Sequence, residues 1–116
     1  MEKKFIAQRL RQSFSDKYLL AEKYYSIVSA VNNMKLTERE IQLIAFTAIH
    51  GNMSYTNVRE DFCRKHSTSS PTINNIISKL KKMGILVKDH GKIKVAPVIN
   101  LKFDNDVVLQ ITLSHG

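Results

Sequence analysis

The chain has 116 residues, of which 43% are hydrophobic and 24% are charged. This size and composition fit one small globular domain and exclude two ordinary domains or a disordered chain. The single cysteine, Cys63, excludes an internal disulfide and a cysteine-based zinc site. Because no apolar run approaches a membrane-spanning length and no secretory signal is recognisable, we expect a soluble, cytoplasmic protein with no membrane partner.

The net charge is +8, from 18 Lys and Arg against 10 Asp and Glu. Residues 67–102 contain seven lysines and one acidic residue, Asp89, whereas residues 103–116 contain two acidic residues and no Lys or Arg. A basic stretch of this kind is typical of a surface that binds a polyanion. A lysine-rich solvated surface would also explain the excess, because the chain has 13 lysines and 5 arginines.

The N-terminal third has the apolar spacing of helices. A loose period covers residues 4–14. A longer helix begins at Asp16, with Ser15 as its cap, and is ended by Asn32 and Asn33. We expect residues 1–35 to form a helical extension that covers the core or contacts another subunit.

A capping box at Thr37 and Glu40 predicts the start of the next helix, with Leu36 and Ile41 as its hydrophobic staple. Gly51 is placed to end this helix.

A short helix is predicted over residues 54–65, capped by Ser54 or Thr56. We interpret Cys63, on its apolar side, as a small buried hydrophobic residue rather than a reactive thiol. A polar turn over residues 66–69 follows.

The next helix is expected to take Ser70 as its cap and Pro71 as its first residue, and to end at Met83 and Gly84. Its core stripe consists of Ile73, Ile76, Ile77 and Leu80. The opposite face carries amides, hydroxyls and lysines, and no acidic residue lies between Asp61 and Asp89.

The apolar period then changes from 3.6 to 2, which indicates strands. Leu86–Asp89 and Lys92–Val95 flank His90-Gly91 and predict a tight hairpin. Val98–Phe103 and Val107–Leu113 predict a second, C-terminal β-hairpin.

This order of elements is that of a winged helix-turn-helix. Residues 36–96 resemble the DNA-binding lobe of the MarR-like regulators in Leu36-Thr37-Glu38, Gly51, the Ser70-Pro71-Thr72 start and the Lys81–Leu86 exit. They are also similar to small winged-helix proteins of tailed bacteriophages. The chain lacks the long C-terminal helix through which MarR-like proteins dimerise. The expected fold class is α+β, mainly α, with the winged helix at 36–96, the extension at 1–35 and the β-hairpin tail at 97–116.

The resemblance implies that the helix at 70–83 lies in the major groove and that the basic wing at 86–95 lies at an adjacent minor groove. Hydroxyls would meet backbone or base edges, the two asparagines would pair with adenine edges, and lysines would bind phosphates. Five phosphate contacts would give a logarithmic salt slope of about −4 to −5. The expected DNA-binding residues are Ser69, Ser70, Thr72, Asn74, Asn75, Ser78, Lys79, Lys82, Lys92 and Lys94.

Ordinary structural roles would also explain some of these residues. Helix capping alone explains Ser70, Pro71 and Thr72, and lysines complement the dipole at a helix end. The four histidines are too scattered for a metal site, and no catalytic constellation or phosphate loop is present. We therefore expect no enzyme activity, no cofactor and no small-molecule ligand.

Two functions remain open. The first is a dimeric regulator of transcription that binds double-stranded DNA. The second is a winged-helix assembly component, such as a phage packaging, virion or ring subunit, that acts through protein contacts in the host cytoplasm or the virion. The apolar C-terminal strand and the tyrosine-rich N-terminal helix favour the second.

Overall fold

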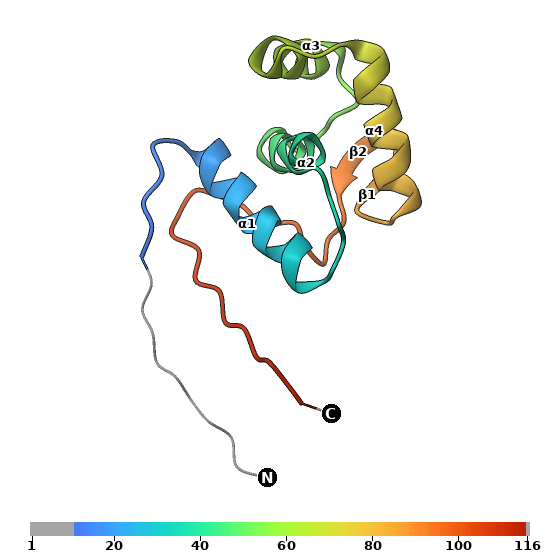
Figure 1. Ribbon diagram of the computed structural model, residues 1–116. Helices are drawn as coiled ribbons and strands as arrows, with labels where there is room; N and C mark the ends of the chain where they lie inside the picture. The colour runs from blue at the N-terminus through green and yellow to red at the C-terminus, as the bar shows by residue number, and fades with distance from the viewer. Residues whose placement is uncertain (1–10, 116) are drawn as a thin grey trace.

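The computed structural model describes residues 11–115 (Figure 1). This part of the chain forms four helices and one antiparallel hairpin: α1 (Lys17–Val31), α2 (Glu38–His50), α3 (Thr56–His66), α4 (Ser70–Lys82), β1 (Leu86–Asp89) and β2 (Lys92–Val95). The predicted α+β class is confirmed, and the layout is that of a winged helix, with α3 and α4 as the helix pair and β1–β2 as the wing. Within residues 11–115 no helix has the length and apolar character needed to cross a membrane.

Helix α1 begins one residue later than predicted. Asp16, not Ser15, is the cap, and its carboxylate accepts a hydrogen bond from the Leu19 amide at 2.9 Å. The end of the helix at Asn32 is confirmed. The helix expected over residues 4–14 lies mostly outside the described residues, and residues 11–14 are not helical.

Helix α2 has the predicted ends. The Thr37 amide donates to Glu40 Oε1 at 2.8 Å, and the Glu40 amide donates to Thr37 Oγ1 at 3.2 Å. Gly51 ends the helix with φ of +80°, a left-handed conformation that glycine adopts without a Cβ clash. Five consecutive residues from Leu43 to Thr47 are buried, because α2 lies between α1 on one side and α3 and the hairpin on the other (Figure 1).

Helices α3 and α4 are confirmed with shifted starts. Tyr55 precedes α3 without a side-chain cap, so neither Ser54 nor Thr56 has the predicted role. Ser69, not Ser70, is the N-cap residue of α4, and its hydroxyl bonds to the Thr72 hydroxyl at 3.0 Å instead of to a backbone amide. The predicted core stripe of α4 is confirmed, with Ile73, Ile77 and Leu80 buried and Ile76 partly buried.

The hairpin has the predicted strands and turn. Leu86 pairs with Val95 and Asp89 pairs with Lys92. The turn residues His90 and Gly91 have φ of 50° and 78°, as a tight two-residue loop requires.

Two residues after α2 extend this sheet in a way the sequence did not indicate. The Met53 amide donates to the Ile93 carbonyl at 2.9 Å, and the buried Asn52 Oδ1 accepts from the Ile93 amide at 3.0 Å. The same oxygen accepts from the Ser54 amide at 2.9 Å. One amide side chain therefore replaces part of a third strand.

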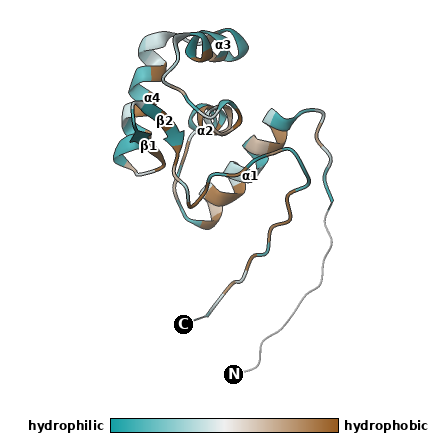
Figure 2. Cartoon of the chain, turned by 180° about the vertical axis from the view of Figure 1, so that it is seen from behind, coloured by the Kyte–Doolittle hydropathy of each residue, from teal (hydrophilic) through white to brown (hydrophobic). Residues whose placement is uncertain are grey.

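The predicted C-terminal hairpin is wrong, since residues 98–113 contain no strand. The first part of this segment packs on α1: Phe103 is buried against Tyr24 and Tyr25, and the Tyr25 hydroxyl donates to the Ile99 carbonyl at 2.9 Å. The rest leaves the helical body as an extended, largely hydrophobic chain (Figure 2). A strand needs a hydrogen-bonded neighbour, and because residues 98–103 pack on α1, residues 107–113 have none within residues 11–115.

Candidate nucleic-acid interface

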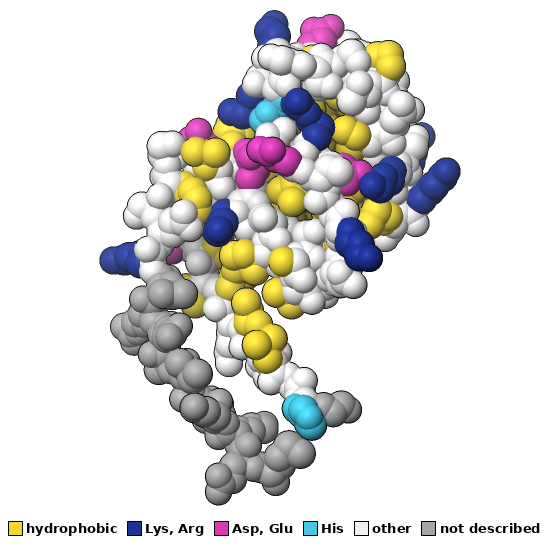
Figure 3. All heavy atoms as spheres, in the orientation of Figure 1, with side chains coloured by type: hydrophobic (Ala, Val, Ile, Leu, Met, Phe, Trp, Pro, Cys, Tyr) yellow, Lys and Arg dark blue, Asp and Glu magenta, His cyan; other side chains and the backbone are white. Residues whose placement is uncertain are grey.

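The structure places the ten predicted DNA-binding residues on the turn before α4, the outer side of α4, and β2. Nine of them are exposed, and the tenth, Lys94, is half-buried. The core stripe is buried, α4 packs against α3 and the hairpin, and the opposite side of α4 is left in solvent. Basic side chains gather along the edge of the molecule formed by α4 and the hairpin (Figure 3).

Lys79 has a partner that the sequence did not suggest. Its Nζ lies 2.6 Å from Glu40 Oε2, and the side chain of Glu40 is only 5% exposed whereas that of Lys79 is 53% exposed. Burial alone would raise the pKa of Glu40, but the hydrogen bonds from Lys79 and the Thr37 amide, with the lysine charge, outweigh it and hold this pKa below its ordinary value. The Glu40 carboxylate thus completes the cap of α2 and also attaches α4 to α2.

This pairing changes the expected role of Lys79. A lysine whose charge is compensated by a buried carboxylate offers less to a phosphate than a lysine in open solvent. The sequence could not reveal the pair, because its two members are 39 positions apart and belong to different helices.

The side chain of Asn74 also has a hydrogen-bond partner. Arg59, on α3, donates from Nε to the Met53 carbonyl at 2.9 Å and from Nη1 to Asn74 Oδ1 at 2.6 Å. Arg59 is not among the residues that the sequence predicted to bind DNA. The only sequence signal was a basic residue in the helix that precedes the recognition helix.

Five predicted residues have side chains without a polar partner. These exposed side chains, which make no hydrogen bond or ion pair with the rest of residues 11–115, are those of Ser70, Asn75, Ser78, Lys82 and Lys92. Lys94 Nζ is 3.9 Å from Asp89 Oδ2, a weak pairing because Asp89 also bonds His90 Nδ1 at 2.5 Å.

The start of α4 presents backbone donors. The side chain of its N-cap residue, Ser69, makes no hydrogen bond to a backbone amide of the first turn, and Pro71 contributes no N–H. Unpaired amides and the positive end of the helix dipole at such a position suit an anion.

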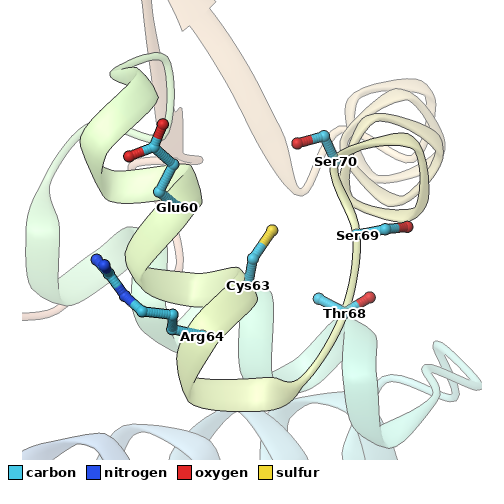
Figure 4. A pocket seen from close by; sticks show the side chains of 6 residues that line it. All are labelled: Glu60, Cys63, Arg64, Thr68, Ser69 and Ser70. Atoms are coloured by element: carbon cyan, nitrogen blue, oxygen red, sulfur yellow. The ribbon is translucent and has the colours of Figure 1, made fainter.

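A shallow, open depression of about 430 Å³ lies between α3 and this turn (Figure 4). Glu60, Cys63, Arg64, Thr68, Ser69 and Ser70 line it. Its one basic side chain, Arg64, pairs with Asp61, and Cys63 is half-buried against the core. No enclosed ligand cavity results, and within residues 11–115 no cluster of three metal-ligating side chains occurs.

Two histidines are the last residues of α2 and α3, and their rings pack against Phe46 and Phe62. His50 accepts or donates at 2.9 Å with the Tyr18 hydroxyl, and the His66 carbonyl accepts from Arg39. Burial lowers the pKa of both imidazoles, and Arg39 and Lys65 lower that of His66 further.

These features define a small α+β domain with the layout of a winged helix and an acid-free polar face on α4. No protein-family model matches the sequence, and comparisons with curated proteins and with solved structures find no match.

Proposed function

We propose that the protein is a regulator of transcription that binds double-stranded DNA, with α4 in the major groove and the β1–β2 hairpin at the adjacent minor groove. One observation carries the proposal. The solvent-facing side of α4 holds uncharged polar side chains and lysines but no acidic residue, and α4 packs against the strand that begins the basic hairpin. An ordinary solvated helix face would mix acidic and basic residues.

In this proposal, the side chains that have no partner among the described residues supply the contacts with DNA. Asn75 has both amide atoms available, which is what bidentate recognition of an adenine edge requires. Lys82 on α4 and Lys92 and Lys94 on the hairpin would each bind a phosphate. The backbone amides at the start of α4 would bind a further phosphate. Because Lys79 is paired with Glu40, we expect three lysine–phosphate contacts and a logarithmic salt slope of about −3.

Binding can be tested by fluorescence anisotropy of a labelled duplex, titrated at about 50, 100 and 200 mM salt. The informative variant is Asn75→Ala, and the matched control is Asn57→Ala, which removes an exposed asparagine from α3. We expect the first to weaken binding to a selected duplex and the second to leave it unchanged. Absence of salt-dependent binding by the unaltered protein, or equal effects of the two variants, would contradict the proposal.

We further propose that the regulator acts as a homodimer in the cytoplasm and that its DNA-binding unit is of the MarR-like kind, similar to the small winged-helix proteins of tailed bacteriophages. A dimer matches a palindromic operator, with two copies of α4 about one helical turn of DNA apart. Residues 100–115, which follow the hairpin, contain no helix.

One observation favours a second candidate, an assembly component such as a phage packaging, virion or ring subunit. Residues 107–113 are uncharged and extended, and Val108 and Leu113 are 91% and 90% exposed. An extended apolar segment without a hydrogen-bonded neighbour is a template for strand addition. The occupant we propose is the same segment of a second copy, paired antiparallel around Gln110, so that Leu109 faces Ile111 of that copy and the apolar sides coincide.

Mass photometry or light scattering separates the two candidates. A dimer that binds DNA with the expected salt slope supports the regulator, whereas a larger closed oligomer that binds no duplex supports the assembly component. The double variant Leu109→Asn with Ile111→Asn should return the protein to monomers. Both side chains are exposed in the single chain, so the variant should still fold. The control Thr112→Asn lies on the opposite side of the segment and should not change the oligomeric state.

A further inference from the structure

The contact between Arg59 and Asn74 fixes the orientation of an amide on the proposed recognition face. Arginine has N–H donors and no acceptor, so the Asn74 atom that lies 2.6 Å from Nη1 must be the carbonyl oxygen. Turning the amide by 180° would set its NH₂ group against the guanidinium. The Nδ2 end of Asn74 therefore points away from Arg59, on a side chain that is exposed to solvent.

The guanidinium is itself held in place. Its Nε donates to the Met53 carbonyl at 2.9 Å, and the Met53 amide donates to the Ile93 carbonyl in β2 at 2.9 Å. Because the guanidinium is planar and its donors diverge at fixed angles, the bond to Met53 determines where Nη1 can lie. Backbone beside the hairpin thus sets the position of a side chain on α4.

This arrangement alters what Asn74 can recognise. Bidentate pairing with adenine needs an acceptor for the N6 amino group as well as a donor for N7. In Asn74 the acceptor already serves a cation, and the positive charge beside it opposes the approach of a second donor. What remains at this site is the Nδ2 donor of Asn74 and the unused N–H groups of Arg59. Guanine, unlike adenine, presents two acceptors in the major groove, N7 and O6.

We infer that Arg59 is a positioning residue that makes Asn74 a hydrogen-bond donor toward DNA, and that the Arg59–Asn74 pair selects guanine over adenine at the base that faces Asn74. This inference rests on the proposed DNA-binding function. Asn75, whose amide has no partner among the described residues, keeps both atoms available and reads a different base.

The test is selection of binding sites from a randomised duplex pool, followed by affinity measurements on single-base variants of the best site. We expect one position at which the unaltered protein prefers guanine to adenine by about tenfold. Arg59→Gln should remove or reverse the preference at that position and leave the others unchanged, and Asn74→Ala should remove it at the same position. The matched control is Arg64→Gln, which removes an arginine of the same helix whose partner among the described residues is Asp61.

Each outcome bears on a separate statement. If no duplex binds, the proposed function fails and this inference fails with it. If duplexes bind but guanine is preferred at no position, or Arg59→Gln retains the preference, the inference alone is overturned. Should Arg59→Gln fail to fold, Arg59→Lys keeps the charge but cannot reproduce the two-pronged geometry, and it should lose the guanine preference in the same way.

Discussion

Lys79 and Lys82 lie three residues apart on α4 but differ in their surroundings, and replacing each by methionine separates a role in stability from the proposed role in DNA binding. Lys79 neutralises a buried carboxylate, whereas the Lys82 side chain is exposed and has no partner within the described residues. We expect Lys79→Met to lower the stability of the fold with little effect on the salt dependence of DNA binding. Lys82→Met should do the reverse.

The size of the stability change follows from the surroundings of Glu40. Removing one partner of a fully buried ion pair costs about 3–5 kcal/mol. Here one partner is half in water, and Glu40 keeps its hydrogen bond from the Thr37 amide, so solvent screening reduces the loss. We expect Lys79→Met to lower the free energy of unfolding by about 1–2 kcal/mol, or the Tm by about 5–10 °C. Lys82→Met should stay within about 0.5 kcal/mol of the unaltered protein.

Urea unfolding at neutral pH measures the first effect, and anisotropy titrations at several salt concentrations measure the second. Lys82→Met should reduce the magnitude of the logarithmic salt slope by about 1, whereas Lys79→Met should leave it nearly unchanged. The pKa of Glu40 is lowered in the folded state, so its charge stabilises the fold above pH 4.5 and this contribution is lost as the pH falls through the folded value. The stability difference between the unaltered protein and Lys79→Met should therefore shrink in acid. Equal stability of the two proteins at neutral pH, or equal salt slopes for the two variants, would refute the reasoning.

Three other perturbations test the fold. Asn52→Ala leaves the buried Ile93 amide without an acceptor and should lower the free energy of unfolding by about 1–3 kcal/mol in urea titrations. Tyr25→Phe removes the hydroxyl that holds the C-terminal segment on α1 and should cost about 1 kcal/mol and speed hydrogen exchange in that segment. Because burial lowers the pKa of His50 and His66 below 6.5, the folded state binds fewer protons than the unfolded chain. The free energy of unfolding should therefore decline as the pH falls through about 6.5.

A matched variant serves as the control for each of these tests. Asn57→Ala removes an exposed asparagine and should change stability by no more than about 0.5 kcal/mol, so a loss equal to that of Asn52→Ala would contradict the account of Asn52. Tyr24→Phe removes a hydroxyl that has no hydrogen bond within residues 11–115, and its effect should be smaller than that of Tyr25→Phe. Replacing both His50 and His66 by glutamine should flatten the pH dependence between neutral pH and pH 5, which an unchanged slope would exclude.

Elements with local causes could be predicted from the amino-acid sequence. The capping box at Thr37, the glycine that ends α2, the core stripe of α4 and the tight turn at His90-Gly91 all depend on residues within one or two turns of each other, and all are confirmed. The choice between neighbouring cap residues failed at α1 and α4, because two polar residues in succession have similar capping ability. Which of the two neighbouring residues becomes the N-cap depends on how each helix packs.

Contacts between distant parts of the chain depend on how the helices pack, and the sequence did not reveal them. The alternating pattern at 107–113 is a property of the segment, but a strand also needs a neighbour, and the burial of Phe103 on α1 takes that neighbour away. In the candidate site, the sequence placed polar and basic residues on one side of α4, while the fold decided that Lys79 is paired with Glu40 and that Asn74 is held by Arg59. Periodicity fixes the direction in which a side chain leaves its helix, but the partner it meets there depends on which other helix lies alongside.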